Sequence, residues 1–403
     1  MVRFADIEAA RDRIAGAIYH SPCPDSIPLS EITGMKIFCK FDNLQHTGSF
    51  KERGARNALT QLPSDQQKRG VIAASAGNHA QALGYQGKLL GIPATVVMPK
   101  FAPLVKVNNC QKLGTTVVLH GKDFGEAKAH AHEIGKEKGL AYIDGYDDPA
   151  IIAGQGTMGL EIVEQVPDLD AVIIPVGGAG LLAGVSLAVK TLRPDAKIVA
   201  VEAENVASFS AALEAGKPVK IALHPTLADG LAIPQVGSNA FEIARSLVDQ
   251  PVTVTEEQIA LAILRLVELE KSVVEGAAAT PLAACLSGKL KDLAGKRVVL
   301  LLCGGNIDPN VLSRVIERGL VADGRLGRFT AVISDRPGGL ADLAAQIAAS
   351  GASIKQVVHD RAFASSDISA VNVLCTVETR NHEHLAELRA KLKSHGVKTY
   401  DSK

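Results

Sequence analysis

Short apolar runs alternate with longer amphipathic stretches along most of the chain, starting near Gly70. The short runs are rich in β-branched residues, and the longer stretches repeat their apolar positions with the spacing of a helix. This alternation predicts an α/β fold with doubly wound parallel sheets. Runs without a polar position, such as 298–302, are typical of strands covered on both faces. The predicted strands are 70–74, 94–98, 115–119, 171–175, 197–201 and 297–302.

The pattern changes near residue 321. Residues 322–327 read Ala-Asp-Gly-Arg-Leu-Gly, which predicts a linker. The segment 328–403 then has the order strand, helix, strand, strand, helix, strand, which predicts a ferredoxin-like βαββαβ module. We therefore expect a large domain over 1–321 and a small one over 328–403.

Composition limits the kinds of partner. The 403 residues are 47% hydrophobic, with 43 Lys and Arg against 43 Asp and Glu. A net charge of zero gives no reason to expect binding to nucleic acid or to an anionic membrane. Six cysteines without paired spacing, and an N-terminal stretch without an apolar core, are typical of a reduced cytoplasmic protein. Residues 171–189 are uncharged, but Pro175 and the glycines after it favour strand, turn and helix over a membrane span.

One lysine is placed where its amine could act as a nucleophile. Lys51 follows Thr47 and Ser49, which are good N-caps, and the apolar positions after it predict a helix start. The positive end of the helix dipole favours an unprotonated amine. Schiff-base chemistry needs a neutral amine, although a lone first-turn lysine is usually only solvated.

Three turns follow directly after apolar strands, where ligands of open α/β sheets gather. The first offers free backbone N–H groups suited to a carboxylate and consists of Ser75, Ala76, Gly77, Asn78 and His79. The second has little side-chain bulk, so its backbone could close around a phosphate; it consists of Gly177, Gly178, Ala179, Gly180 and Leu181. The third places Cys303 and Asn306 on either side of two glycines.

The second turn also matches a dinucleotide fingerprint, Gly178-x-Gly180-x-x-Ala183, with Glu202 ending the next strand. An NAD-dependent dehydrogenase is therefore an alternative. It leaves Lys51 and the other two turns unexplained, and it places the fingerprint in mid-chain.

Four motifs together resemble one family. They read SFKERGA at 49–55, ASAGNHAQ at 74–81, PVGGAGL at 175–181 and CGGNID at 303–308. In this order they are similar to the serine/threonine dehydratases, which are pyridoxal-phosphate enzymes of fold type II. The resemblance implies two doubly wound subdomains, the smaller one (roughly 54–150) inserted in the larger. The SDRPGGL run at 334–340 is similar to an ACT domain, a small-molecule sensor often found on such enzymes.

The resemblance also implies roles for the cofactor-binding residues. Lys51 would bind pyridoxal phosphate covalently, and Phe50 would lie against one face of the pyridine ring. Asn78 would hydrogen-bond the phenolic oxygen, and the turn 177–181 would hold the phosphate. Cys303 would face the pyridine nitrogen, where many relatives have serine.

The remaining implied roles concern substrate and cations. The turn 75–79 would bind the substrate carboxylate. Glu275 lies in a stretch of small residues and could approach the cofactor. No role is assigned to it. Glu202 resembles a cation ligand of some relatives, but the aspartate that can accompany it is replaced by Ser208, which weakens a divalent-ion site.

The implied reaction is β-elimination of L-threonine to 2-oxobutanoate and ammonia, with some activity on L-serine. The Lys51 amine would take the α-proton as a general base. Serine racemase is the alternative within the same chemistry. It needs a second acid–base group on the opposite face of the ring, and by resemblance that group is a serine at the position of Ala76.

The C-terminal module is expected to bind an amino-acid effector. Asp335, Pro337 and Gly338 form the turn between its first strand and first helix, where backbone groups could hold a small zwitterion. Isoleucine and valine are the leading effectors by resemblance, and a purely structural dimerisation module is the alternative. We expect a homo-oligomer, either a dimer or a tetramer.

Overall fold

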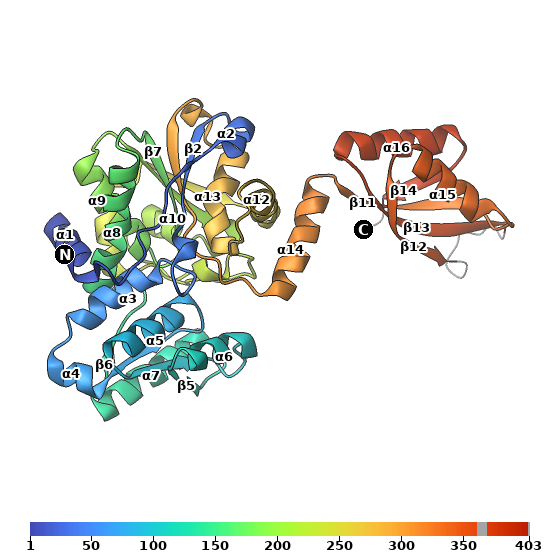
Figure 1. Cartoon of the computed structure of the whole chain (residues 1–403). Coiled ribbons are helices and arrows are strands. Elements are labelled where there is room, and N and C mark those ends of the chain that lie inside the picture. Colours follow the sequence, from blue (N-terminus) through green and yellow to red (C-terminus); the bar gives the residue numbers. More distant parts are fainter. Residues whose placement is uncertain (361–368, 402–403) are drawn as a thin grey trace. The chain divides into compact units, whose positions relative to one another are not determined.

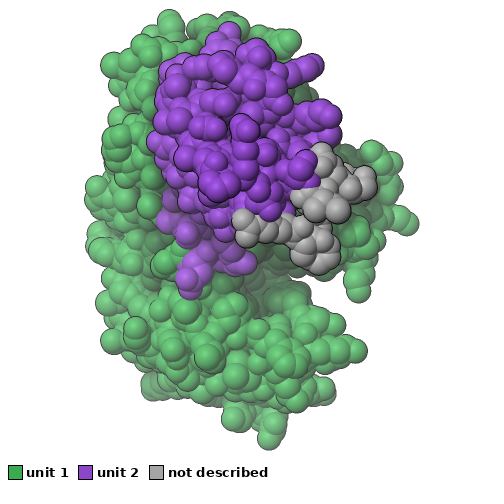
Figure 2. Space-filling view, turned by 90° about the vertical axis from the view of Figure 1, so that its right-hand side faces the viewer, with its two compact units in different colours: residues 1–309 green, residues 310–403 purple. Residues whose placement is uncertain are grey.

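The computed structural model describes residues 1–360 and 369–401 (Figure 1). Contacts divide the chain into two compact units, Met1–Pro309 and Asn310–Lys403, which Figure 2 colours separately. The first unit contains two sheets and the second unit contains one, and each unit has its own apolar core, so each is described by itself.

The larger sheet of the first unit has the strand order β1-β2-β10-β7-β8-β9. Its strands are parallel except for β1, which pairs antiparallel with β2. In Figure 1, α8 and α9 lie on one side of this sheet and α12 and α13 on the other. The strands are β1 (Asp25–Ser26), β2 (Lys36–Lys40), β7 (Ala171–Pro175), β8 (Lys197–Ala203), β9 (Gln250–Val254) and β10 (Arg297–Leu301).

The smaller sheet of the first unit is fully parallel, with the order β5-β4-β3-β6. Helix α7 packs on one face, and α5 packs on β4 and against α3. The strands are β3 (Val71–Ala74), β4 (Ala94–Met98), β5 (Thr116–Leu119) and β6 (Ala141–Tyr142). Two parallel sheets, as expected for the doubly wound subdomains, are thus confirmed.

Helices connect these strands. They are α1 (Phe4–Ile14), α2 (Ile27–Thr33), α3 (Lys51–Thr60), α4 (Ser64–Arg69), α5 (Asn78–Leu90), α6 (Leu104–Lys112), α7 (Phe124–Lys138), α8 (Pro149–Gln165), α9 (Gly180–Leu192), α10 (Ser208–Ala215), α11 (Ser238–Ala244), α12 (Glu256–Leu269) and α13 (Gly276–Leu286), with short 3₁₀ turns η1 (Asp42–Leu44), η2 (Glu204–Val206), η3 (Asp229–Leu231) and η4 (Lys291–Leu293).

The apolar runs form strands because both of their faces are covered. All residues of β3 and β7 are buried, as are four of the five in β10. The uncharged segment 171–189 forms β7, a glycine turn and most of α9. Among residues 1–360 and 369–401, no helix is long and apolar enough to cross a membrane.

The second unit contains an antiparallel sheet with the order β12-β13-β11-β14. Its core consists of apolar residues from β11, β13, α15 and α16, including Phe329, Val373 and Leu388. The elements are α14 (Pro309–Ala322), β11 (Leu326–Ser334), α15 (Gly339–Ala349), β12 (Ser353–Asp360), β13 (Ala370–Glu378), α16 (His382–Ser394) and β14 (Lys398–Asp401). The predicted βαββαβ order is confirmed.

The expected linker is structured differently. Residues 322–327 contain the end of α14, a turn over 323–325 and the first two residues of β11. Backbone hydrogen bonds hold this turn, including Arg325 N to Leu320 O and Thr379 N to Arg325 O. By contacts, the boundary between the units falls after Pro309 and not at residue 321.

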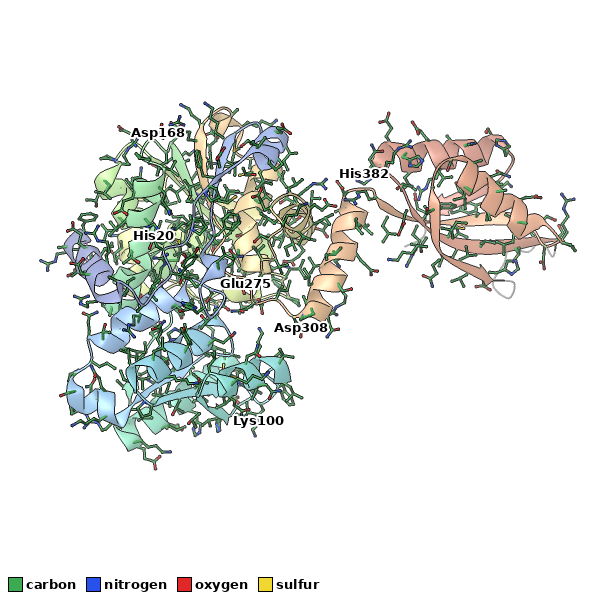
Figure 3. All side chains as sticks on the ribbon, viewed as in Figure 1. His20, Lys100, Asp168, Glu275, Asp308 and His382 are labelled. Carbon is green, nitrogen blue, oxygen red and sulfur yellow. The ribbon has the colours of Figure 1, made fainter. Side chains whose placement is uncertain are left out.

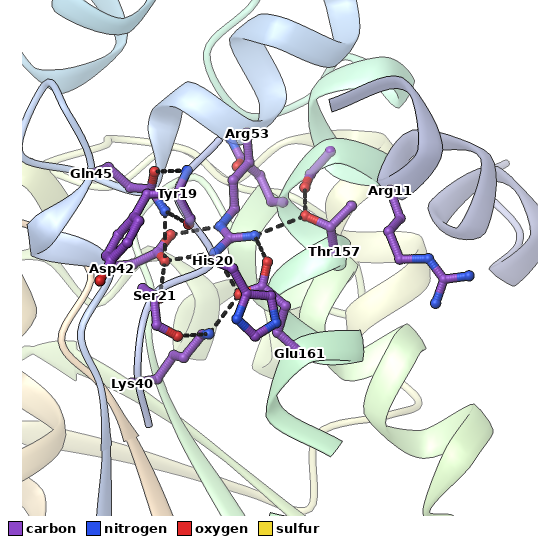
Figure 4. Close-up of polar contacts among 12 residues, drawn as sticks. Arg11, Tyr19, His20, Ser21, Lys40, Asp42, Gln45, Arg53, Thr157 and Glu161 are labelled. Carbon is purple, nitrogen blue, oxygen red and sulfur yellow. Dashed lines mark hydrogen bonds and ion pairs between the residues drawn. The ribbon is translucent and has the colours of Figure 1, made fainter. Parts of the chain in front are cut away.

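A buried cluster of charged side chains fixes the start of α3 (Figure 4). Arg53 donates to both oxygens of Asp42 at 2.7 Å and to Glu161 at 2.5 and 2.9 Å. Lys40 Nζ also donates to Glu161, at 2.5 Å, and to the carbonyl of Ser21. Burial alone would raise the pKa of Asp42, but Arg53 holds that pKa below its usual range. The cluster joins β2, η1, α3 and α8 through groups that cannot be left unpaired inside the protein.

Candidate active site

Two turns that are distant in sequence lie side by side at the start of α3. Ser49 and Gly304 form an isolated antiparallel bridge, and Phe50 N donates to Cys303 O at 3.0 Å. Gly305 N donates to Gly48 O at 2.9 Å. The motif around Lys51 is therefore built directly against the turn that follows β10.

The N-caps predicted from the sequence are wrong. Helix α3 begins at Lys51, and Phe50 occupies the N-cap position without a side-chain hydrogen bond. The hydroxyls of Thr47 and Ser49 are buried and have no hydrogen-bond partner among the described residues. A buried hydroxyl without a partner is costly, so these two groups indicate room for a polar ligand.

The Lys51 amine lies inside the first unit. Its Nζ donates to the carbonyl of Gly145 at 2.6 Å and lies 5.1 Å from the centre of the Phe50 ring. Burial lowers the pKa of Lys51 to about 8, against the opposing influence of Asp144, Cys303 and Glu275. From the sequence, the helix dipole was expected to lower the pKa of Lys51, whereas desolvation is the main cause.

The turn after β3 presents backbone N–H groups at the start of α5. Gly77 is the N-cap and no side chain caps this helix, which begins at Asn78. The side chain of His79 is directed elsewhere, since its Nε2 lies 3.1 Å from Ile143 O. Burial and the nearby Lys51 lower the pKa of His79 to about 4, which keeps it neutral. A neutral His79 ring adds no positive charge to an anion site at this turn.

The glycine turn after β7 packs tightly against Tyr146. A Cβ on Gly178 would lie 2.2 Å from the Tyr146 ring, and one on Gly180 would lie 2.2 Å from the Tyr146 carbonyl. Ala179 has a φ of 70°, and α9 begins at Gly180. A helix N-terminus preceded by such a turn is a ready anion site.

The third turn brings a network of polar side chains to the site. Asn306 Nδ2 donates to Asn78 Oδ1 at 2.8 Å, and Asn78 Nδ2 donates to Glu275 Oε1 at 2.7 Å. Burial and Asp229 raise the pKa of Glu275 to about 7. Burial also raises the pKa of Cys303 well above its usual value, so its thiol stays neutral. Figure 3 shows Glu275 at the end of α13 nearest the small subdomain.

These residues suit pyridoxal phosphate. A desolvated amine, a glycine turn at a helix N-terminus and two unpartnered hydroxyls match an aldehyde that carries a phosphate. The structure thus brings Phe50, Lys51, Asn78 and Cys303 together, as the resemblance implied. It adds Gly145, Tyr146 and Asn306, to which the sequence alone assigned no role.

Comparison with known proteins decides the family. Residues 14–304 match the family described as Pyridoxal-phosphate dependent enzyme. This chain belongs to that family. It is 42% identical to the L-threonine ammonia-lyase of Thermotoga maritima and 43% identical to that of Geobacter sulfurreducens, in each case over 396 residues and 98% of both chains.

Solved structures agree with this assignment. The processed form of threonine deaminase isoform 2 from Solanum lycopersicum is 37% identical, with a TM-score of 0.74 over 78% of this chain and 91% of that one. Serine racemase from Dictyostelium discoideum is also 37% identical, with a TM-score of 0.72 over 76% of this chain and 99% of that one. The pyridoxal-phosphate resemblance seen in the four motifs is confirmed.

The NAD alternative is wrong for this pyridoxal-phosphate enzyme. Glu202, the acid of the fingerprint, accepts hydrogen bonds from Phe209 N at 2.7 Å and from the N and Oγ of Ser210 at 2.9 and 2.6 Å. Its carboxylate caps α10 and is not free for a ribose. Both oxygens of Glu202 thus accept hydrogen bonds from the start of α10. Within residues 1–360 and 369–401, no group of three His, Cys, Asp or Glu could hold a metal ion.

The second unit has a cavity at the predicted effector turn. Its volume is about 490 Å³, and its lining includes Asp335, Arg336, Pro337, Gly338 and His359. His359 comes from β12, which the sequence alone did not connect with this turn.

Proposed function

We propose that this chain is an L-threonine ammonia-lyase that converts L-threonine to 2-oxobutanoate and ammonia and also acts on L-serine. The observation that carries the proposal is the match to two L-threonine ammonia-lyases over 98% of both chains. The site supports it, because an elimination of this kind requires a lysine amine that is neutral near physiological pH.

In this proposal, pyridoxal phosphate is held by Lys51, Phe50, Asn78, Cys303 and the turn Gly177-Gly178-Ala179-Gly180-Leu181. When bound, the cofactor supplies an electron sink for the negative charge that develops on Cα. The thiol of Cys303 contributes no charge, because burial keeps it protonated. A neutral thiol would not keep the pyridine nitrogen of the cofactor protonated, as a carboxylate would. Negative charge on Cα would then be less stabilised, which favours early loss of the β-hydroxyl.

Lys51 acts as the base. With a pKa of about 8, about a tenth of this amine is unprotonated at pH 7, which is far more than for an ordinary lysine. It removes the α-proton of threonine while the turn 75–79 holds the substrate carboxylate with its backbone N–H groups. The β-hydroxyl leaves as water, and the α-proton taken up by Lys51 balances the proton that this departure needs; water later replaces the nitrogen and releases ammonia.

Serine racemase is the second candidate, because a serine racemase is 37% identical over most of this chain. Racemisation requires a proton donor on the face opposite Lys51. Ala76, in the turn after β3, has no proton to give. We therefore expect elimination to exceed racemisation.

The second unit is proposed to be an ACT domain that binds isoleucine or valine and regulates the enzyme. Its βαββαβ order and the cavity at Asp335, Pro337 and Gly338 support this proposal. Strand β12 lies at the sheet edge and exposes Ile354 and Val358, which supports a homo-oligomer. The six cysteines are free and buried, which supports a cytoplasmic enzyme.

A steady-state assay tests the main proposal. The purified enzyme with pyridoxal phosphate should form 2-oxobutanoate from L-threonine faster than pyruvate from L-serine, and Lys51→Ala should do neither. Equal or faster formation of D-serine than of pyruvate from L-serine would instead favour the racemase.

Regulation is tested by calorimetry and by truncation. Isoleucine or valine should bind the full-length chain and shift the threonine saturation curve, with a coupling of about 1–3 kcal/mol in both directions. A chain ending at Arg325 should lose the shift. Absence of amino-acid binding outside the active site would reject the regulatory role.

A further inference from the structure

Three side chains from separate parts of the sequence form one chain of hydrogen bonds beside Lys51. Asn306 follows β10, Asn78 begins α5, and Glu275 precedes α13. Asn306 Nδ2 donates to both Thr47 O at 2.7 Å and Asn78 Oδ1 at 2.8 Å. Asn78 Nδ2 donates to Glu275 Oε1 at 2.7 Å.

Only one assignment of donors and acceptors fits this chain of hydrogen bonds. Thr47 O is a backbone carbonyl and can only accept, so Asn306 must turn its NH₂ group toward it. The second N–H of Asn306 then donates to Asn78, which must present its oxygen on that side. Asn78 consequently turns its own NH₂ group toward Glu275, and one of its two N–H groups has no acceptor among residues 1–360 and 369–401.

The backbone is shaped to keep these groups in contact. Gly48 has a φ of 74°, and a Cβ there would lie 2.7 Å from Asn306 Oδ1. A Cβ on Gly304 would lie 2.2 Å from Glu275 Oε1. Glu275 N also donates to Gly304 O at 3.0 Å. Two glycines therefore provide the space that both ends of the network need.

We propose that Asn306 and Glu275 are positioning residues that fix the orientation of the Asn78 amide and so leave one N–H for the cofactor. This inference rests on the proposed role of Asn78 toward the phenolic oxygen. It adds that the orientation is imposed from Thr47 O through Asn306, and that Glu275 accepts at the far end whether or not it carries a proton.

The charges around Glu275 set how the network responds to pH. Asp229 from η3 opposes ionisation of Glu275, whereas the Asn78 amide, Lys106 from α6 and Lys51 from α3 favour it. Lys106 is itself paired with Asp229 at 2.7 Å. With a pKa of about 7, Glu275 can donate a hydrogen bond below neutral pH but can only accept above it.

Asn306→Asp is the sharpest test, because it keeps the shape and removes both donors. The new carboxylate can only accept, so Asn78 must reverse its amide to donate to it. The Asn78 oxygen then faces Glu275, which is tolerable only while Glu275 is protonated. The affinity of the apoprotein for pyridoxal phosphate, titrated by absorbance without any substrate, should fall about tenfold or more at pH 8. The affinity of the variant is compared with that of the wild-type protein at the same pH. The loss of affinity should be smaller at pH 6 than at pH 8.

Three further variants complete the design. Glu275→Gln still accepts from Asn78 and cannot titrate, so it removes the titration of Glu275 from the network. Adding it to Asn306→Asp should remove the difference between pH 6 and pH 8, because glutamine can donate at both. Asn205→Asp is the matched control, since Asn205 Nδ2 also donates to a backbone carbonyl, Pro225 O at 2.7 Å, on the surface.

Wild-type affinity of Asn306→Asp at pH 8, or an equal loss at both pH values, would overturn the proposal. If Asn306→Asp fails to fold, Asn306→Ala replaces it, and wild-type affinity in that variant would also overturn the proposal. No binding of pyridoxal phosphate by the wild-type protein would instead reject the cofactor site. Threonine turnover is not measured, so the substrate assignment is tested separately.

Discussion

Lys51 Nζ lies 2.6 Å from the carbonyl oxygen of Gly145, a residue 94 positions later in the chain. Lys51 starts α3, whereas Gly145 lies in the loop between β6 and α8. This contact, which the local sequence does not reveal, fixes the position of the partly buried amine. Burial then disfavours its charged form.

The reactivity of Lys51 should follow its lowered pKa. The free amine attacks the cofactor, and the charged form is the one that burial disfavours, so the fraction available rises with pH. The rate at which apoprotein binds pyridoxal phosphate covalently should increase through about pH 8 and level off above it. Stopped-flow absorbance measures this rate. A midpoint near the ordinary lysine value of about 10.4 would show that the amine is not desolvated.

The Tyr146 ring is predicted to leave no room for a side chain at position 178. A Cβ at Gly178 would overlap the Tyr146 ring, which lies 2.2 Å from that position. Gly178→Ala should therefore destabilise the apoprotein and weaken binding of inorganic phosphate. Tyr146→Ala should recover part of the loss of stability when combined with it, because the two residues are in contact.

Urea unfolding of the two single variants and the double variant measures this coupling between Gly178 and Tyr146. Additive effects on the free energy of unfolding would contradict the packing. Gly77→Ala is the control for adding a methyl group without a clash, since neither Gly77 nor Gly178 has a left-handed φ and a Cβ added at Gly77 would have no neighbour within 4 Å.

The buried charge cluster should dominate the stability of the first unit. Asp42→Asn leaves Arg53 with one charged partner fewer, and breaking a buried pair costs about 3–5 kcal/mol. Asp65→Asn is the matched control, because its pair with Arg69 is exposed and worth at most about 1 kcal/mol. Urea unfolding compares the two, and equal effects would contradict the assigned role.

The same cluster predicts a dependence on acid. The pKa of Asp42 is lower in the folded protein than its ordinary value of 3.8, so its contribution is present above that value. It is lost as the pH falls through the folded-state pKa. In acid, the free energy of unfolding of Asp42→Asn should therefore depend less on pH than that of the wild-type protein.

Ala76→Ser should raise racemase activity. A serine hydroxyl would supply a proton donor on the face opposite Lys51, while elimination continues to use Lys51. Chiral chromatography of L-serine incubations measures D-serine against pyruvate. If D-serine does not increase in a variant with wild-type cofactor absorbance, Ala76 is not the residue that separates the two reactions.

The sequence predicted the elements well because they depend on local patterns. Strands β3, β7 and β10 are continuous apolar runs, and the turns after them contain the small residues that their backbone requires. The motif containing Lys51 was identified for the same reason.

Long-range contacts were not predictable in this way. Tyr146 follows a two-residue strand, and nothing in its neighbourhood indicates that it packs on Gly178, 32 positions later. Phe50 displaced Thr47 and Ser49 from the N-cap because the bridge to Gly304 fixes the backbone before α3. Glu202 had the sequence context of a ligand, yet the hydrogen bonds at the start of α10 determine what its carboxylate does.

The central claim, that Lys51 binds pyridoxal phosphate, has a direct measurement. The protein loaded with pyridoxal phosphate is reduced with borohydride, which fixes the cofactor on the lysine that holds it, and is then digested for peptide mass spectrometry. We predict a pyridoxyl group on Lys51 and none on the Lys51→Ala protein treated in the same way. A pyridoxyl group on any other lysine of the wild-type protein, with Lys51 unmodified, would contradict the claim.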